Sequence, residues 1–287
     1  MKLATFCSAA GEGRIGAVVE GKMVDLTAAE PRLPSDMLSL VQMGAQGLAL
    51  AEKAAEHAQM FPLNEITLRA PIMNPPAFLG VGLNYIDHVR EAHLEMPAEP
   101  TVFNKQVSSL VGSGAEVLLP ELSDQLDYEG ELAVVVGQAR RGMGPEEAIQ
   151  AIFGYLIVND LSLRDIQFAS PTVTMGKSFD THGPCGPWIV TADEISDAQE
   201  LAIQTRVNGA VRQSGTTADM VFSCAEILVY LSRVMTLAPG TIVTTGTPAG
   251  VGHFLNPPGY LRAGDTVEVE IAGIGVLTND VVRELIS

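Results

Sequence analysis

The sequence predicts an α+β fold dominated by β-strands, in the form of a compact mixed roll or barrel with a small α/β part at the N-terminus. Three observations favour this class. Short β-branched runs separated by turn residues recur through most of the chain, few segments have helical periodicity, and strands and helices do not alternate regularly. Because a doubly wound sheet needs that alternation, we expect a mostly-β fold instead.

Residues 1–70 form the predicted small N-terminal domain. Residues 3–26 have the pattern of short strands with turns at 11–13 and 20–22, and residues 36–59 have the composition of a helix that Ser35 would cap. Several prolines between residues 62 and 76 then prevent a helix. We therefore place a boundary near residue 70, followed by a larger domain over residues 71–287.

The larger domain holds the strongest strand signals and two further helices. Strands are predicted at 132–136, 155–158, 188–191, 241–245 and 266–271, and a turn at 273–275 leads into 276–284. Pro145 suits the first position of one helix. Ser223 and Glu226 form a capping box at the start of the other.

Composition excludes several classes of partner. The 34 acidic residues against 17 basic ones give a formal net charge of −17, which repels nucleic acid and anionic membranes. No apolar run approaches the length of a membrane helix, and the short apolar stretch at the start, interrupted by Ser8, is a poor signal peptide. The three cysteines have no paired spacing, which argues against disulfides and zinc–thiolate sites. We expect a cytoplasmic protein.

Three carboxylates are candidate metal ligands. Glu129 and Glu131 are two residues apart ahead of an apolar strand, so they would point the same way, and Asp160 ends another apolar strand. Buried like charges need a cation between them, and carboxylate oxygens suit Mg²⁺, Mn²⁺ or Ca²⁺. The alternative is that the two glutamates form the solvated face of an edge strand.

His88 and Glu91 are three residues apart, so they would face each other on one helical turn. A carboxylate beside an imidazole fixes its tautomer and raises its basicity, as a general base requires. An ordinary solvated turn would give the same spacing.

Two glycine-rich segments do not match nucleotide-binding motifs, and a third allows two interpretations. Pro171 stands where a phosphate loop ending at Lys177 needs glycine, and Tyr85 stands where a dinucleotide fingerprint needs its third glycine. The loop at 244–252 follows a strand, and its backbone amides with the Thr247 hydroxyl would suit a carboxylate, although a plain array of turns explains it equally well.

Taken in order, these motifs resemble the fumarylacetoacetate hydrolase family. The matching elements span roughly residues 71–285. They are Gly82-Leu83-Asn84-Tyr85 through His88 and Glu91, Phe103 with Lys105, residues 127–131, Asn159-Asp160 through Arg164 and Gln167, residues 176–180, Gly186-Pro187-Trp188 and residues 245–252. Their joint occurrence in this order is specific, and it favours the metal site over the solvated strand.

The resemblance implies a mixed β-roll with a small, variable N-terminal part, assembled as a homodimer. It implies that Glu129, Glu131 and Asp160 bind Mg²⁺ or Mn²⁺, with Ca²⁺ as a possible substitute in crystals. His88 and Glu91 would form the base dyad on a segment that orders as a lid, and Lys177 would be the catalytic lysine. The implied substrate contacts are Tyr85, Arg164, Gln167 and Thr247.

The resemblance also implies a reaction, namely metal-dependent hydrolysis of the C–C bond of a small 2,4-dioxo acid of the acylpyruvate, fumarylpyruvate or diketo-deoxy sugar acid type. The acid would chelate the cation, water activated by His88 would attack the 4-oxo carbon, and the cation and Lys177 would hold the pyruvate enolate. Oxaloacetate decarboxylation and isomerisation of 2-hydroxy-diene-dioates use the same enolate and are alternatives. A catalytically silent, metal-holding structural protein is the alternative of another class, against which the intact His88, Glu91 and Lys177 argue.

Overall fold

The computed structural model describes residues 1–8 and 13–285, so most of the turn expected at 11–13 lies outside the described residues. Strands hold 35% of the residues and helices 24%, which confirms the mostly-β α+β class. The sheets do not close into a barrel, so the roll is the correct form of the prediction. β17 and β6 run parallel while their neighbours pair antiparallel, so the large sheet is mixed.

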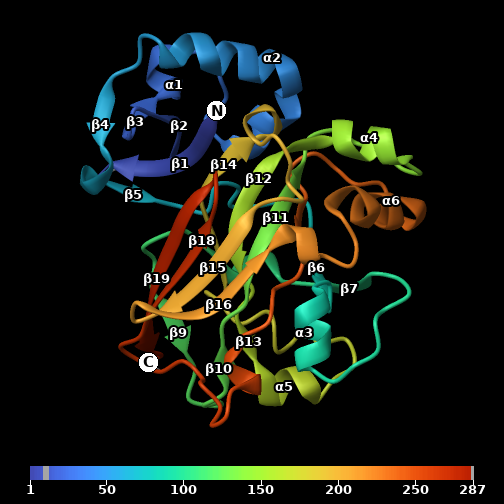
Figure 1. The fold of residues 1–287 in the computed structure, drawn as a ribbon. Helices are drawn as coiled ribbons and strands as arrows, with labels where there is room; N and C mark the ends of the chain where they lie inside the picture. Colours follow the sequence, from blue (N-terminus) through green and yellow to red (C-terminus); the bar gives the residue numbers. More distant parts are fainter. Residues whose placement is uncertain (9–12, 286–287) are drawn as a thin grey trace.

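Figure 1 shows the elements in space. The large sheet has the order β4 (Met60–Pro62), β3 (Lys22–Asp25), β2 (Arg14–Val19), β1 (Lys2–Ser8), β14 (Gly183–Thr191), β12 (Ile152–Asn159), β11 (Gly130–Val136), β17 (Ile242–Thr244), β6 (Phe78–Gly82) and β7 (Thr101–Asn104). β5 (Ile66–Leu68) pairs with β1, and β8 (Leu110–Val111) pairs with β14. The second sheet has the order β16 (Ala210–Thr216), β15 (Ala202–Val207), β18 (Thr266–Ile271), β19 (Gly275–Arg283) and β9 (Val117–Leu119), while β10 (Leu126–Asp127) pairs with β13 (Ser162–Leu163).

The helices are short apart from two. They are α1 (Leu26–Ala29), α2 (Met37–Ala55), α3 (Ile86–Glu91), α4 (Pro145–Gln150), α5 (Arg164–Phe168) and α6 (Cys224–Val234). The 3₁₀ turns are η1 (Leu63–Glu65), η2 (Val107–Ser109), η3 (Ala192–Glu194), η4 (Thr217–Asp219) and η5 (Gly252–Phe254). Among the described residues, no helix is long and apolar enough to cross a membrane.

The N-termini of the helices show which sequence signals correctly predicted where a helix begins. The capping box of Ser223 and Glu226 is formed as predicted, and Pro145 opens α4. The prediction of Ser35 as a cap was wrong. Asp36 caps α2, because its carboxylate accepts from the Ser39 amide at 2.9 Å, and carboxylate and hydroxyl groups are nearly equivalent as caps.

Strand β11 lies inside the molecule, with both faces buried. Leu132, Val134 and Val136 contribute to one hydrophobic cluster with α6 and the second sheet. Ala133 and Val135 contribute to another, which includes side chains of β1 and α2. A continuous run of β-branched and aliphatic residues suits a strand covered on both sides. A polar side chain at the start of β11 is therefore shielded from solvent.

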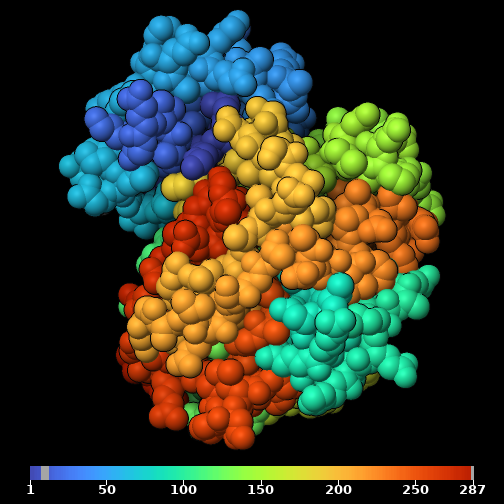
Figure 2. Space-filling view, viewed as in Figure 1, coloured from blue at the N-terminus to red at the C-terminus, as the bar shows by residue number. Residues whose placement is uncertain are grey.

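The N-terminal elements form one end of the molecule (Figure 2). They join the rest through the large sheet, because β1 pairs with β14 in the register Lys2↔Val190 and Leu3↔Ile189. The domain boundary predicted near residue 70 falls between β5 and β6 and stays a prediction, since strands from both sides of it share one sheet.

Candidate functional site

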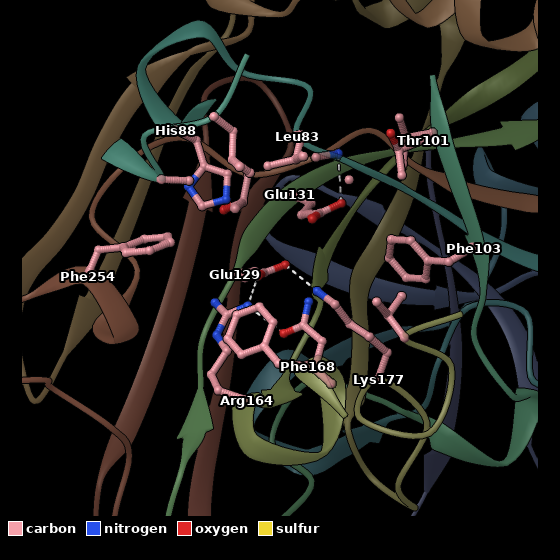
Figure 3. Close-up of a pocket in the computed structure, with 18 residues that line it drawn as sticks. Leu83, His88, Thr101, Phe103, Glu129, Glu131, Arg164, Phe168, Lys177 and Phe254 are labelled. Carbon is pink, nitrogen blue, oxygen red and sulfur yellow. Dashed lines mark hydrogen bonds and ion pairs between the residues drawn. The ribbon is translucent and has the colours of Figure 1, made fainter. Parts of the chain in front are cut away.

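A cavity of about 230 Å³ opens at the ends of β6, β11 and β17. Figure 3 shows the 18 residues that line it. Seven of the predicted site residues are among them: His88, Glu129, Glu131, Arg164, Gln167, Lys177 and Thr247. They come from the start of β11, helices α3 and α5, and the loops before β14 and after β17. Segments far apart in the sequence thus meet at one end of the central strands.

Glu129 and Glu131 lie on one face of the chain, as the spacing predicts, because Gly130 between them faces the second sheet. A Cβ on Gly130 would collide with the Thr205 hydroxyl and lie 2.8 Å from Val269 Cγ1. Glycine therefore lets the second sheet approach closely, and the two glutamates are left on the side of the cavity.

The ends of β11 and β12 hold the third carboxylate beside these two. The Asp160 amide donates to the Glu129 carbonyl at 2.8 Å, and Asn159 Oδ1 accepts from the Glu129 amide at 3.0 Å. One ligand oxygen of each of Glu129, Glu131 and Asp160 lies within 4.8 Å of the others, and all three residues are buried. The structure thus assembles the predicted ligand set.

Lys177 and Arg164 compensate part of this negative charge. Lys177 Nζ contacts Glu129 Oε2 at 2.6 Å and Asp160 Oδ2 at 2.7 Å. Arg164 Nη1 lies 2.6 Å from Glu129 Oε1. Burial alone would raise the pKa of Glu129, but these cations outweigh it and lower the pKa to about 2. Glu129 is therefore ionised.

Glu131 differs, because no cationic side chain pairs with it in the described structure. Its Oε2 accepts a hydrogen bond from the Gly246 amide at 2.9 Å. Burial, with repulsion from Asp160 and Glu129, raises its pKa well above the usual value. A hard divalent cation between the three carboxylates would relieve that repulsion, and oxygen donors are what such cations prefer. The residues present fit Mg²⁺ or Mn²⁺.

Lys105 supports the cluster of Glu129, Glu131 and Asp160. The sequence did not predict this role, although the residue matched a family motif. Its side chain is fully buried, and its Nζ contacts Asp160 Oδ1 at 2.6 Å together with the carbonyls of Lys177 and His182. Burial lowers the pKa of Lys105, while Asp160 opposes that shift. One ammonium thus fixes both a ligand carboxylate and the backbone that carries Lys177.

The His88–Glu91 dyad is formed on α3. His88 Nδ1 lies 3.1 Å from Glu91 Oε2. Because a carboxylate only accepts, Nδ1 carries the proton in the neutral ring and the lone pair is left on Nε2. Glu91 itself lies behind His88 and does not line the cavity. The surface alternative is excluded for His88, which is 7% exposed.

Thr247 is held by a buried amide that the sequence did not indicate. Its hydroxyl donates to the Gly130 carbonyl at 2.9 Å and accepts from Gln213 Nε2 at 2.7 Å. Gln213 Oε1 accepts from the Gly130 amide at 3.0 Å, and Nε2 also donates to the Pro248 carbonyl. Gln213 therefore ties the start of β11 to the loop after β17.

Of the predicted substrate contacts, Tyr85 does not line the cavity, and Arg164 lines it with a guanidinium that is already paired with carboxylates of the protein. Tyr85 is fully buried in the core and does not line the cavity, and burial raises the pKa of its hydroxyl well above the usual value. It packs among apolar side chains, and its backbone forms an antiparallel β-bridge with Met220. Arg164 lines the cavity, but its guanidinium pairs with Asp127 and Glu129 and donates to Gln167 Oε1 at 2.9 Å.

Comparisons with known proteins agree with this geometry. The sequence model described as "Fumarylacetoacetate (FAA) hydrolase C-terminal" matches residues 77–282. A mitochondrial oxaloacetate tautomerase of Xenopus laevis is 40% identical over 94% of this chain and 86% of its own. The solved fumarylacetoacetate hydrolase of Exiguobacterium antarcticum superposes with a TM-score of 0.88 at 37% identity, covering 99% of this chain and 100% of that one. The maleylpyruvate hydrolase of Sphingobium sp. SYK-6, solved with manganese(II) and pyruvate, gives 0.84 at 29% identity and the same coverage.

Proposed function

Because the chain belongs to the fumarylacetoacetate hydrolase family, we propose that it is a metal-dependent keto–enol tautomerase of small 2-oxo acids. The observation that carries the proposal is that the carboxylates of Glu129 and Glu131 and the base His88 line one cavity. A relative with 40% identity bears the name oxaloacetate tautomerase, which supports this reaction over others of the family.

His88 would move the proton. Its Nε2 lone pair accepts a proton from C3 of the 2-oxo acid, and the C–H electron pair becomes the C2–C3 double bond while the carbonyl pair moves to oxygen. The imidazolium then returns the proton to that oxygen, which gives the enol, and the reverse sequence gives the ketone. Glu91, 3.1 Å from Nδ1, stabilises the imidazolium between the two transfers.

The floor of the cavity would stabilise negative charge on the substrate oxygen. Glu129, Glu131 and Asp160 would hold a Mg²⁺ or Mn²⁺ ion, which would supply Lewis-acid stabilisation of that charge. Lys177 adds a buried positive charge beside it. Arg164 and Gln167 act by position, since the first fixes Glu129 and the second accepts from Arg164.

The test follows the loss of enol absorbance after crystalline enol-oxaloacetate is diluted into buffer with Mg²⁺ or Mn²⁺. The protein should accelerate ketonisation, and a chelator should remove the acceleration. His88→Ala should lower turnover by roughly 10²- to 10⁴-fold, the usual scale of general base catalysis. His57→Ala is the matched control, because the His57 side chain is 83% exposed at the end of α2. No acceleration above buffer with either metal, for enol-oxaloacetate and enol-phenylpyruvate alike, would overturn the proposal.

Hydrolysis of a 2,4-dioxo acid to pyruvate and a second acid is the second candidate. It is favoured by the likeness to a maleylpyruvate hydrolase solved with pyruvate, and by a cavity that extends past the charged floor to Phe168 and Phe254. In this reaction His88 would take a proton from water, and the resulting hydroxide would attack the 4-oxo carbon. The C3–C4 bond would then break, its electron pair would enter the pyruvate enolate, and the imidazolium would return the proton to C3 as the second acid leaves. Pyruvate release from acylpyruvates and fumarylpyruvate, with and without chelator, separates it from tautomerisation.

A further inference from the structure

The cavity has a polar floor and an apolar outer wall. The outer wall is formed by five residues that we call the apolar collar: Leu83, Leu94, Phe168, Val173 and Phe254. Figure 3 shows Phe254 on the side of His88 and Phe168 in front of Arg164. Phe168 is 61% exposed, Leu94 54% and Phe254 38%. Large apolar side chains therefore stand open to solvent around the entrance of the site.

The collar is held in place by contacts and by unusual backbone. The Phe168 and His253 rings lie 5.1 Å apart, His253 and Phe254 lie 4.9 Å apart, and Phe254 meets the His88 ring edge-on at 6.0 Å. Leu83 and Val173 have φ of +56° and +52°, a region that side chains, and β-branched ones above all, rarely adopt. Strain of this kind persists where the surrounding structure fixes a side chain for function.

The charges around the collar disfavour a second carboxylate on the substrate. None of the five collar residues is charged. The two cations of the floor, Arg164 and Lys177, are already paired with carboxylates of the protein. The described lining of the cavity has no other lysine or arginine, so it offers no further side-chain cation of these types to a second carboxylate.

We propose that the apolar collar binds an apolar or aromatic substituent on C3 of the 2-oxo acid, so that aryl- and alkyl-substituted 2-oxo acids are substrates. The inference rests on the proposed function for the position of the oxo-acid head at the metal ligands. Burying a side-chain-sized apolar group against the collar should tighten binding by roughly 10- to 100-fold.

Binding of two unreactive mimics in the presence of Mg²⁺ tests this without turnover. Oxamate has the carboxylate and carbonyl of the head alone, and oxanilate carries a phenyl ring on the same head. Titration calorimetry should show oxanilate binding roughly 10- to 100-fold more tightly than oxamate. Phe168→Ala should reduce that ratio several-fold. Met175→Ala is the matched control, because Met175 lies in a nearby loop, is 66% exposed and does not line the cavity.

Equal affinities of the two mimics would overturn the inference, as would a Phe168→Ala variant that weakens both equally, since the collar would then only seal the cavity. If neither mimic binds, the head position and the inference fail together.

Turnover separates the two proposals. Tight oxanilate binding without enol–keto exchange of oxaloacetate or phenylpyruvate would overturn the tautomerase but support the collar. Phe168→Arg, which places a cation on the collar, should shift kcat/KM from phenylpyruvate toward oxaloacetate by roughly 10-fold or more.

Discussion

The backbone amide of Gly250 donates a 2.9 Å hydrogen bond to Glu91 Oε1, and so ties the dyad on α3 to the loop after β17. The other carboxylate oxygen of Glu91 faces His88. Gly250 has φ of +104°, and a Cβ there would collide with the Arg212 carbonyl. Only glycine presents this amide without strain, so the position of the base depends on a glycine in another segment.

Glu91→Gln should lower kcat by roughly 10²-fold while leaving Mg²⁺ affinity unchanged. A glutamine amide keeps the bond from Gly250 but turns a donor toward His88 Nδ1, which moves the imidazole proton to Nε2 and removes the base. Steady-state kinetics and calorimetric titration of Mg²⁺ measure the two effects. Glu95→Gln, an exposed glutamate in the same segment, is the control. Unchanged kcat in Glu91→Gln would show that the dyad has no role in proton transfer.

Glu131→Gln should abolish metal uptake and turnover together, because it removes the carboxylate that no cationic side chain compensates. The same change should raise the thermal midpoint of the metal-free protein, since burial and the neighbouring carboxylates raise the pKa of Glu131 and make its charge costly. Metal analysis after dialysis and calorimetric melting are the measurements. Glu270→Gln, which alters a half-exposed glutamate paired with Arg206, is the control. Full activity of the variant in chelator would contradict the metal site.

Lys177 should not form an imine with the substrate. Burial would lower the pKa of Lys177, but Asp160 and Glu129 outweigh it and raise the pKa, so the amine stays protonated. Borohydride added during turnover should therefore trap no adduct. Peptide mapping distinguishes Lys177 from Lys105, whose pKa burial lowers. A reduced adduct on Lys177 would assign the enolate to covalent chemistry instead.

His182 should make the protein sensitive to acid. Burial, and to a lesser degree Lys105, lower its pKa to about 4, although the hydrogen bond to the Leu118 carbonyl at 2.8 Å opposes that shift. The folded state thus keeps His182 neutral while the unfolded state gains a proton below about pH 6.5. The free energy of unfolding should fall by about 2 kcal/mol between pH 7 and pH 5 on this account.

His182→Gln keeps a donor for the Leu118 carbonyl and removes the titration. Urea unfolding at pH 7 and pH 5 should show a smaller loss of stability in the variant than in the parent protein. His57→Gln, at an exposed site, should behave as the parent does. Identical pH dependence in the parent protein and His182→Gln would show that other groups dominate.

Sequence patterns were sufficient where one physical effect decides the structure. The β-branched run at 132–136 lies in β11, and the capping box places the start of α6. They were insufficient in β16, where no strand was predicted. Val211 and Gln213 are two residues apart, yet Val211 is 53% exposed and Gln213 is buried, because the register shifts between them and Gln213 bonds to Gly130, Thr247 and Pro248. Partners that are 34 to 83 residues away leave no local signal.

The candidate site likewise has features that the sequence predicted and features that only the fold reveals. The triad and the dyad follow from local spacing and from the resemblance, and the structure assembles both. The role of Lys105 follows from three contacts, to residues 55 to 77 positions away, which only the fold brings together. The substrate role of Tyr85 stays a prediction, because its side chain is buried among core residues and does not line the cavity.

The pairing of β1 with β14 sets a limit on how the protein can be shortened. The family match begins at residue 77, which invites a truncated chain. Removing residues 1–70 would leave the edge of β14 that pairs with β1, at Ile189 and Val190, without hydrogen-bond partners. It would also expose the apolar side chains that α2 covers. An open, apolar strand edge recruits strands of other molecules. A chain that starts at residue 71 should therefore form aggregates, visible by light scattering, even though every metal ligand and the dyad would still be encoded in it.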